Sequence, residues 1–285
     1  MPTRALCRGD YGGPIEGPAV GEQALVEISG LVASPSRAGL VWMHNDSGGG
    51  PRLYAVDAEG QPRVRLELPV EARDWEDLAA AACPDRSGPC LWVGDIGDNA
   101  RARDGIIIYA VPEPQSDGEH LAQRVWRFPL TYPGDVRDAE ALVVSPSGDT
   151  FWLFEKDEDD RVNIYGPRGP LVDGVAGEME KVGRFTAPGL DIEMGRMVTA
   201  ADLHPSGERL VLRVYTGIYE YRFEADQGPA DLDDVDPRLV AFGPLSEPQG
   251  ESVAYGEGGD AILTVSEDLQ QQPGQPIHRF PCNPD

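Results

Sequence analysis

The sequence is poor in basic residues. Lys and Arg total 24 against 49 Asp and Glu, which gives a formal net charge of −25 at pH 7. Nucleic acids and anionic membrane surfaces are bound through clusters of Lys and Arg, so neither is an expected partner. A solvated acidic surface that aids solubility explains much of this charge. Cations are the complementary ligands.

Several motifs of known chemistry are also absent. Gly-x-Ser-x-Gly does not occur, and histidine is found only at positions 44, 120, 204 and 278, which leaves few bases for a Ser-His-Asp triad. No Walker or Rossmann glycine pattern is present. No apolar run is long enough to span a membrane, and residues 1–21 show no signal peptide. We therefore expect neither a nucleotide-binding fold nor a membrane span.

Cysteine is scarce, and its four positions are informative. Cys83 and Cys90 bracket a short turn-rich segment, while Cys7 and Cys282 lie near opposite ends of the chain. There is no Cys-x-x-Cys motif, which disfavours a zinc site. An even count placed this way predicts the disulfides Cys7–Cys282 and Cys83–Cys90. We therefore expect a secreted, periplasmic or cell-surface protein whose export signal is absent from this sequence.

A repeat of about 55 residues runs through the chain. Residues 73–78 read RDWEDL and residues 137–142 read RDAEAL, with the same Arg, Asp, Glu and Leu at the same offsets. Three weaker copies of this motif align on the Leu. After each of the five copies comes an aliphatic residue followed by Tyr or His, and these aliphatic residues are at positions 53, 108, 164, 218 and 277. One position of the repeat, which we call the slot position, is held by Ser29, Glu76, Glu140, Thr199 and Glu251.

The repeat also predicts the fold. Each unit contains four short strand patterns, except the last, which has three, and Gly and Pro punctuate them. A strand from the segment before Glu27 can complete the last unit and close a ring, which a Cys7–Cys282 disulfide would lock. We predict an all-β, five-bladed β-propeller that spans residues 1–285 as one monomeric domain, with six blades as the alternative. A stacked solenoid would explain only the period.

The slot position suggests a metal site. In a propeller the first strand of each blade lines the central channel, so the five slot residues should form a ring. Carboxylates that converge there repel one another unless they are protonated or neutralised, and Ca²⁺ suits carboxylates mixed with hydroxyls and carbonyls. The predicted Ca²⁺ ligands are Glu76, Asp77, Glu140 and Glu251. Alternatively, the glutamates pair with Arg73 and Arg137, or bond the backbone of neighbouring blades.

The loops after the second strands should rim the same channel mouth, because first and second strands are antiparallel. These loops, with the end of the strand before the first of them, contain His44, Asp46, Asp95, Lys156, Arg213, Tyr215 and Glu267. Asn and Asp beside Gly also form ordinary turns, which is the alternative explanation for residues 44–48.

The motifs HNDSG (44–48), DWEDLA (74–79) and VGDIGDN (93–99) resemble a largely uncharacterised family of bacterial exported propeller proteins, over most of residues 25–280. The resemblance implies the fold and export. More distantly, the design is similar to calcium-dependent propeller hydrolases, namely the gluconolactonase and paraoxonase group and the β-propeller phytases. Those families have six blades. The predicted ring is also similar to the five-bladed arabinanase-type glycosidases, and no catalytic motif of any of these groups occurs here.

These features predict a calcium-dependent hydrolase of phosphate esters, lactones or related oxyanion-forming substrates. We expect an anionic substrate at the mouth to be bound by Lys156, Arg213, Tyr215 and Glu267. His44 is the expected general base, oriented by Asp46 or Asp95. A non-enzymatic module that binds a ligand or protein through the same face is the first alternative. A glycosidase that uses channel carboxylates is the second.

Overall fold

The computed structural model describes residues 6–46, 49–157, 161–242, 247, 249–267 and 270–283. In these residues the chain forms strands β1 to β23 and the short 3₁₀ helices η1 (Pro229–Asp234) and η2 (Glu257–Gly259). None of the described helices is long and apolar enough to cross a membrane. The prediction of an all-β protein is therefore confirmed.

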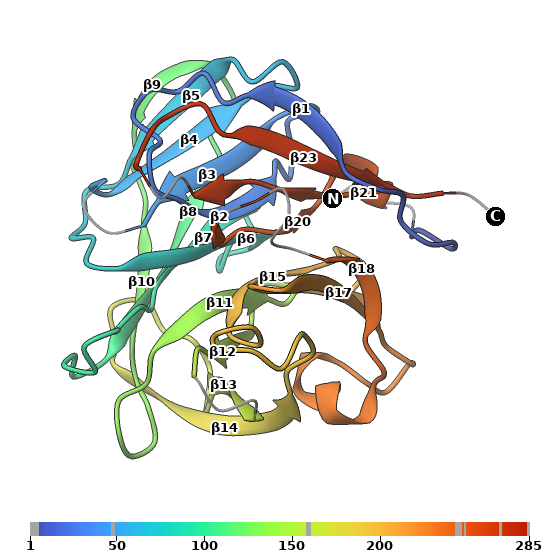
Figure 1. The fold of residues 1–285 in the computed structure, drawn as a ribbon. Helices are drawn as coiled ribbons and strands as arrows, with labels where there is room; N and C mark the ends of the chain where they lie inside the picture. Colours follow the sequence, from blue (N-terminus) through green and yellow to red (C-terminus); the bar gives the residue numbers. More distant parts are fainter. Residues whose placement is uncertain are drawn as a thin grey trace.

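The strands form antiparallel sheets in chain order (Figure 1). The first sheet contains β2 (Ile28–Ala33), β3 (Val41–Asn45), β4 (Arg52–Val56) and β5 (Pro62–Glu67). The second group contains β6 (Trp75–Ala82), β7 (Pro89–Asp95), β8 (Ile106–Pro112) and β10 (Trp126–Thr131). The strand β9 (Gly118–Leu121), which the sequence patterns did not predict, pairs in parallel with the outer edge of β5.

The third group contains β11 (Ala139–Val144), β12 (Phe151–Glu155), β13 (Arg161–Pro167) and β14 (Gly177–Thr186), and a short parallel pairing of β14 with β10 joins it to the second. The fourth sheet contains β15 (Val198–Leu203), β16 (Arg209–Val214), β17 (Gly217–Arg222) and β18 (Arg238–Phe242).

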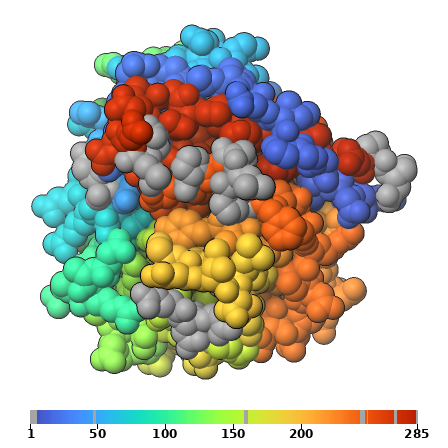
Figure 2. Space-filling model, viewed as in Figure 1, coloured from blue at the N-terminus to red at the C-terminus, as the bar shows by residue number. Residues whose placement is uncertain are grey.

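The last sheet combines the two ends of the chain. Its order is β1 (Ile15–Ala19), β23 (Pro276–Pro281), β21 (Ala261–Thr264) and β20 (Ala254–Tyr255). In Figures 1 and 2 the N-terminal strand lies along the C-terminal one. In the register of this pairing, Ile15 is opposite Arg279. Both predicted disulfides are present, Cys7–Cys282 and Cys83–Cys90. The prediction that an N-terminal strand completes the last unit is confirmed.

The first strand of the last unit differs from prediction. The sequence pattern of this unit predicts a single first strand over residues 251–255, but the structure forms β19 (Gln249–Gly250), which pairs with β22 (Ser266–Glu267), and then β20. Between them the Ser252 hydroxyl donates to the carbonyl of Val265 and accepts from its N–H, at 2.7 and 3.1 Å. This side chain replaces the backbone ladder, which is why the strand is interrupted.

The inner strands of successive sheets contact one another in a closed cycle. The strand β2 touches β6, β6 touches β11, β11 touches β15, β15 touches β20, and β20 returns to β2. Inner strands such as β2, β11 and β15 are buried along their whole length, whereas the outer strand β5 alternates between exposed and buried residues. Apolar side chains from adjacent sheets form the core between them, as Trp42 and Leu53 do with Tyr109. This arrangement is that of a β-propeller-type fold.

Candidate metal centre at the channel mouth

Three of the slot residues lie at β-bulges. Trp75 and Asp77 of β6 pair with the consecutive residues Asp95 and Gly94 of β7, so Glu76 between them has no partner in the ladder. The same shift occurs around Glu140 in β11 and around Thr199 in β15. A bulge bends the strand and changes the direction of a side chain, and bulges are common beside functional sites. The repeated bulge explains how the slot side chains leave the packing surfaces between the sheets.

The structure brings three carboxylates together at one side of this mouth. Asp46 follows β3, Asp74 precedes β6, and Glu76 lies in the β6 bulge. Oxygen atoms of the three side chains lie within 4.8 Å of one another. Only 3 % of Glu76 is exposed, and its Oε1 atom has no hydrogen-bond partner among the described residues. A buried carboxylate oxygen without a donor is a ligand position for a cation.

Gly97 forms the wall of this carboxylate cluster. A Cβ atom at this position would overlap Oε1 of Glu76 and would lie 2.7 Å from Oδ2 of Asp74. The backbone N–H of Gly97 donates to the carbonyl of Asp74 at 3.2 Å. Only glycine therefore leaves the space in which the two carboxylates face each other. The absence of a side chain at Gly97 thus allows the carboxylate oxygens of Asp74 and Glu76 to lie close together.

The electrostatics of the cluster also favour a cation. Burial raises the pKa of Glu76 well above its ordinary value, and the charges of Glu140 and Asp46 raise it further. Burial likewise raises the pKa of Asp74, although the Arg103 guanidinium acts in the opposite direction. Ionising these carboxylates without a counter-ion is therefore unfavourable. A divalent cation would compensate this cost, and all-oxygen ligands are those that Ca²⁺ prefers.

A second predicted ligand, Glu140, has a different partner. Its Oε1 atom accepts a hydrogen bond from the Lys156 ammonium at 2.8 Å, and this ammonium also lies 5.6 Å from the centre of the Tyr215 ring. Burial raises the pKa of Glu140 to about 8 even though Lys156 opposes the shift. Burial lowers the pKa of Lys156, but Glu140 and other acidic groups more than offset this and raise it overall. Glu140 is thus neutralised by an ammonium group rather than held in the three-carboxylate cluster.

Glu251 and Glu267 form a carboxyl pair at the same mouth. Oε1 of Glu251 accepts hydrogen bonds from the Tyr215 hydroxyl at 3.1 Å and from the Gln249 amide at 2.9 Å. Burial raises the pKa of Glu267 to about 8, and its hydrogen bond with Glu251 and the charge of Asp46 contribute. Two carboxyl groups in contact share a proton when like charges cannot both be accommodated. Burial and the neighbouring acidic groups thus favour the protonated form of Glu267.

Asp77 is not a ligand of the cluster. Its carboxylate accepts backbone N–H groups of Leu78 and Leu142, both at 2.8 Å, and of Ala201 at 3.4 Å. These donors belong to β6, β11 and β15. Asp77 therefore links three inner strands, so the backbone bonding that was considered for the channel glutamates occurs at this aspartate instead.

His44 does not lie at the rim where a general base was expected. Its side chain has no exposed surface, its Nδ1 atom is 2.8 Å from the carbonyl of Asn45, and its ring packs edge-on against Trp75. Burial lowers its pKa to about 4. Gly30 lies directly against Nε2, with no room for a side chain. A substrate at the mouth cannot reach this imidazole.

Asp95 and Arg213 are also buried, contrary to the expected rim positions. Asp95 forms an ion pair with Arg103 at 2.7 Å, and its carboxylate accepts the backbone N–H groups of Arg73 and Asp74. Arg213 is 1 % exposed and forms an ion pair with Glu247 at 2.6 Å. Asp95 thus fixes the turn that presents Asp74, whereas Arg213 has no surface to offer a substrate.

Sequence reasoning missed Asp74 and Gly97. Both were visible within quoted motifs, because Asp74 lies two residues before Glu76 in DWEDLA and Gly97 is the second glycine of VGDIGDN. The available signal for Asp74 was its position two residues before Glu76, the residue at the bulge. Nothing in the local pattern indicated that the Gly97 loop packs against Glu76.

Comparison with known proteins does not assign a family. No protein-family model matches the chain, and no curated protein matches it. Among solved structures, one described as "Structure of U3-55K" is similar at 9 % identity with a TM-score of 0.44, and the alignment covers 94 % of this chain and 100 % of that one.

Proposed function

We propose that this protein is an exported, five-bladed β-propeller that binds Ca²⁺ through Asp46, Asp74 and Glu76 and hydrolyses phosphate esters or lactones at the channel mouth. The observation that carries the proposal is the buried Glu76 Oε1 atom, which lacks a hydrogen-bond partner in the described chain and faces a second carboxylate across Gly97. A carboxylate is kept in such a position at a cost in stability unless a cation binds there.

The closed cycle of contacts among β2, β6, β11, β15 and β20 supports a count of five blades. In this interpretation the parallel pairing of β10 with β14 joins the outer edges of two neighbouring blades. The two disulfides support an oxidising compartment, and so does the resemblance of the motifs to exported propeller proteins.

In this proposal the bound cation supplies positive charge that stabilises the oxyanion developing on the substrate. Glu267, whose pKa is raised to about 8 by burial and further by its hydrogen bond with Glu251, exchanges the proton that hydrolysis requires. Tyr215 fixes the position of Glu251. Lys156 carries a positive charge 5.6 Å from the centre of the Tyr215 ring and would orient an anionic substrate.

A non-enzymatic binding module is the second candidate. Two of the groups that catalysis was expected to use, His44 and Arg213, are buried, and Lys156 is already paired with Glu140. These observations favour a protein that binds its ligand at the channel mouth through the bound metal ion, without catalysis by these side chains. The two candidates share the metal site and differ in whether a bound ester or lactone is turned over.

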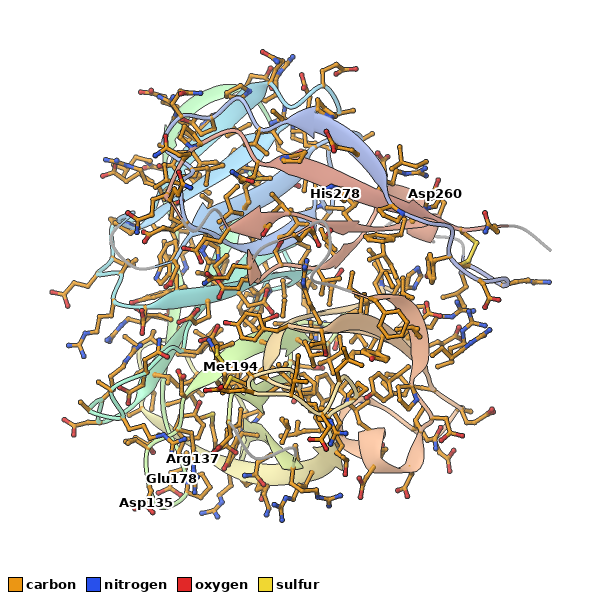
Figure 3. The ribbon with its side chains drawn as sticks, in the orientation of Figure 1. Asp135, Arg137, Glu178, Met194, Asp260 and His278 are labelled. Carbon is orange, nitrogen blue, oxygen red and sulfur yellow. A yellow bond between two sulfur atoms is a disulfide. The ribbon has the colours of Figure 1, made fainter. Side chains whose placement is uncertain are left out.

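The test combines calcium titration with a substrate panel. Calorimetry should show one Ca²⁺ site in the wild type, and Asp74→Asn should weaken it at least tenfold. The protein should hydrolyse at least one member of a panel of aryl phosphates and lactones, and only when Ca²⁺ is present. This activity should be lost in Asp74→Asn. The matched control is Asp260→Asn, because Asp260 is an exposed partner of Arg279 (Figure 3).

Three results separate the candidates. Calcium binding with turnover supports the hydrolase. Calcium binding without turnover on any substrate leaves the binding module. Absence of calcium binding in the wild type refutes both.

A further inference from the structure

A pocket of about 580 Å³ lies beside the mouth, between the loop that precedes β6 and the outer strands of the second group. Three arginines line it, Arg73 before β6, Arg103 before β8 and Arg127 in β10. Its volume is in the range of small-molecule sites. Three guanidinium groups in one pocket are unexpected in a chain with a net charge of −25.

Two of these arginines lack a carboxylate partner. Across the described parts of the chain, neither Arg73 nor Arg127 forms an ion pair, although carboxylates outnumber basic residues by 49 to 24. Arg127 lies directly opposite Tyr109 in the pairing of β10 with β8 and contacts its hydroxyl. Glu71 and Asp104 also line the pocket, but neither is within ion-pair distance of these two arginines. The positive charge is therefore available to a ligand.

The internal repeat explains why Arg73 is unpaired. Its counterpart in the third unit, Arg137, forms an ion pair at 3.1 Å with Glu155 at the end of the second strand. The equivalent acid in the second unit is Asp95, but Arg103 occupies it at 2.7 Å. Arg103 thus pairs with Asp95, the carboxylate that the repeat makes equivalent to the Glu155 partner of Arg137. Arg73 is therefore left without this ion pair.

Arg103 itself is held rigidly. Its terminal nitrogens donate to the carbonyls of Gly97 and Asp95 at 2.7 and 3.0 Å, and its Nε atom is buried without an acceptor among the described residues. The pocket wall also contains the acidic residues Glu71, Asp95 and Asp104, of which Asp95 is paired with Arg103, and an apolar part formed by residues such as Val70, Ile107 and Pro129. The pocket therefore combines an apolar surface with two exposed arginines that have no carboxylate partner in the described part of the chain.

We propose that this pocket binds small organic anions, with the carboxylate or phosphate group between Arg73 and Arg127 and the apolar body against Val70, Ile107 and Pro129. Guanidinium groups bind both oxyanions by paired, charge-assisted hydrogen bonds. The site is separate from the carboxylate cluster, so it does not depend on calcium or on the hydrolytic activity proposed above.

Calorimetry with phenyl phosphate and benzoate, in chelator and at low salt, tests the pocket. Both probes should bind, and phenol, which has the ring without the anion, should not. The double variant Arg73→Ala, Arg127→Ala should weaken binding at least tenfold. The control Arg168→Ala removes another exposed arginine, which is paired with Glu178, and should change nothing.

Glu76→Gln distinguishes this pocket from the metal centre, and should leave the affinity for both probes unchanged. Loss of probe binding in Glu76→Gln would place the probes at the mouth and overturn the proposal. Failure of the wild type to bind either probe at millimolar concentration would also overturn it. The same holds if the double arginine variant binds as tightly as the wild type.

Discussion

Replacing Glu76 by Gln should have opposite effects on stability with and without calcium. In the metal-free protein, Glu76 is a buried carboxylate with one oxygen that has no hydrogen-bond partner in the part of the chain that the structure describes, and its pKa is raised by burial and by neighbouring carboxylates. A buried group left unsatisfied costs about 1–3 kcal/mol. Glutamine keeps the shape, removes the charge and presents amide donors to Asp46 and Asp74. The variant should therefore be more stable than the wild type in chelator.

The magnitudes are measurable by thermal unfolding. For a chain of this size, 1 kcal/mol corresponds to a shift in Tm of roughly 2–4 °C, so Glu76→Gln should raise the Tm in chelator by at least about 2 °C. Calcium at 100 times its Kd should stabilise the wild type by about 2.7 kcal/mol. The variant loses a ligand and should show little of this shift. With saturating calcium the order of the two Tm values should therefore reverse.

The matched control is Glu178→Gln, because Glu178 is an exposed glutamate whose ion pair with Arg168 lies on the surface. It should shift the Tm by less than about 1 °C in either condition. If Glu76→Gln instead lowers the Tm in chelator, the carboxylate is a structural link between strands and the reasoning is wrong. An identical wild-type Tm with and without calcium would be equally decisive against the metal centre.

Three further outcomes are expected. Asp77→Asn should lower the free energy of unfolding by about 2–4 kcal/mol in urea titrations without changing calcium affinity, because one amide oxygen cannot replace two carboxylate oxygens that accept three N–H groups. The stability of the metal-free protein should fall between pH 5 and pH 9, because the raised pKa of Glu267, about 8, gives a contribution that is complete below the ordinary pKa of 4.5 and is lost as pH rises through 8. Unfolding at pH 5, 7 and 9 checks the sign. Cys282→Ser should lower the free energy of unfolding by up to about 5 kcal/mol, because the cross-link closes a loop of 275 residues.

The fold was largely predictable from the sequence because it is built from a repeat. The period located the inner strands, and the missing strand of the last unit required β1 to pair beside β23. The two cysteine pairs followed from their positions at the ends of the chain and around a short hairpin. The strand β9 and the break at Ser252 were not predictable, since both depend on particular side-chain or edge contacts.

The candidate site was predicted only in part. Glu76 was placed at the mouth because it holds the slot position, but its partners Asp46 and Asp74 were not identified as a set with it. Both Lys156 and Arg213 were expected in the loops after their second strands. Lys156 does follow β12, whereas Arg213 lies within β16 and is enclosed by Glu247 and Gly250. Nothing in the two local sequences distinguishes these environments.

The sequence by itself determined the all-β repeat, the closing strand, both disulfides and the excess of carboxylates at the inner strands, because each depends on spacing along the chain. Tertiary structure alone decided which carboxylates cluster together, which pair with a basic residue and which bond the backbone. Those outcomes depend on distances of a few ångströms between segments far apart in sequence, since both desolvation and Coulomb interactions change steeply over that range. Glu76 and Asp77 are adjacent in the chain. Glu76 lies beside two carboxylates with one oxygen that no described residue bonds, whereas Asp77 links three strands through their backbone N–H groups.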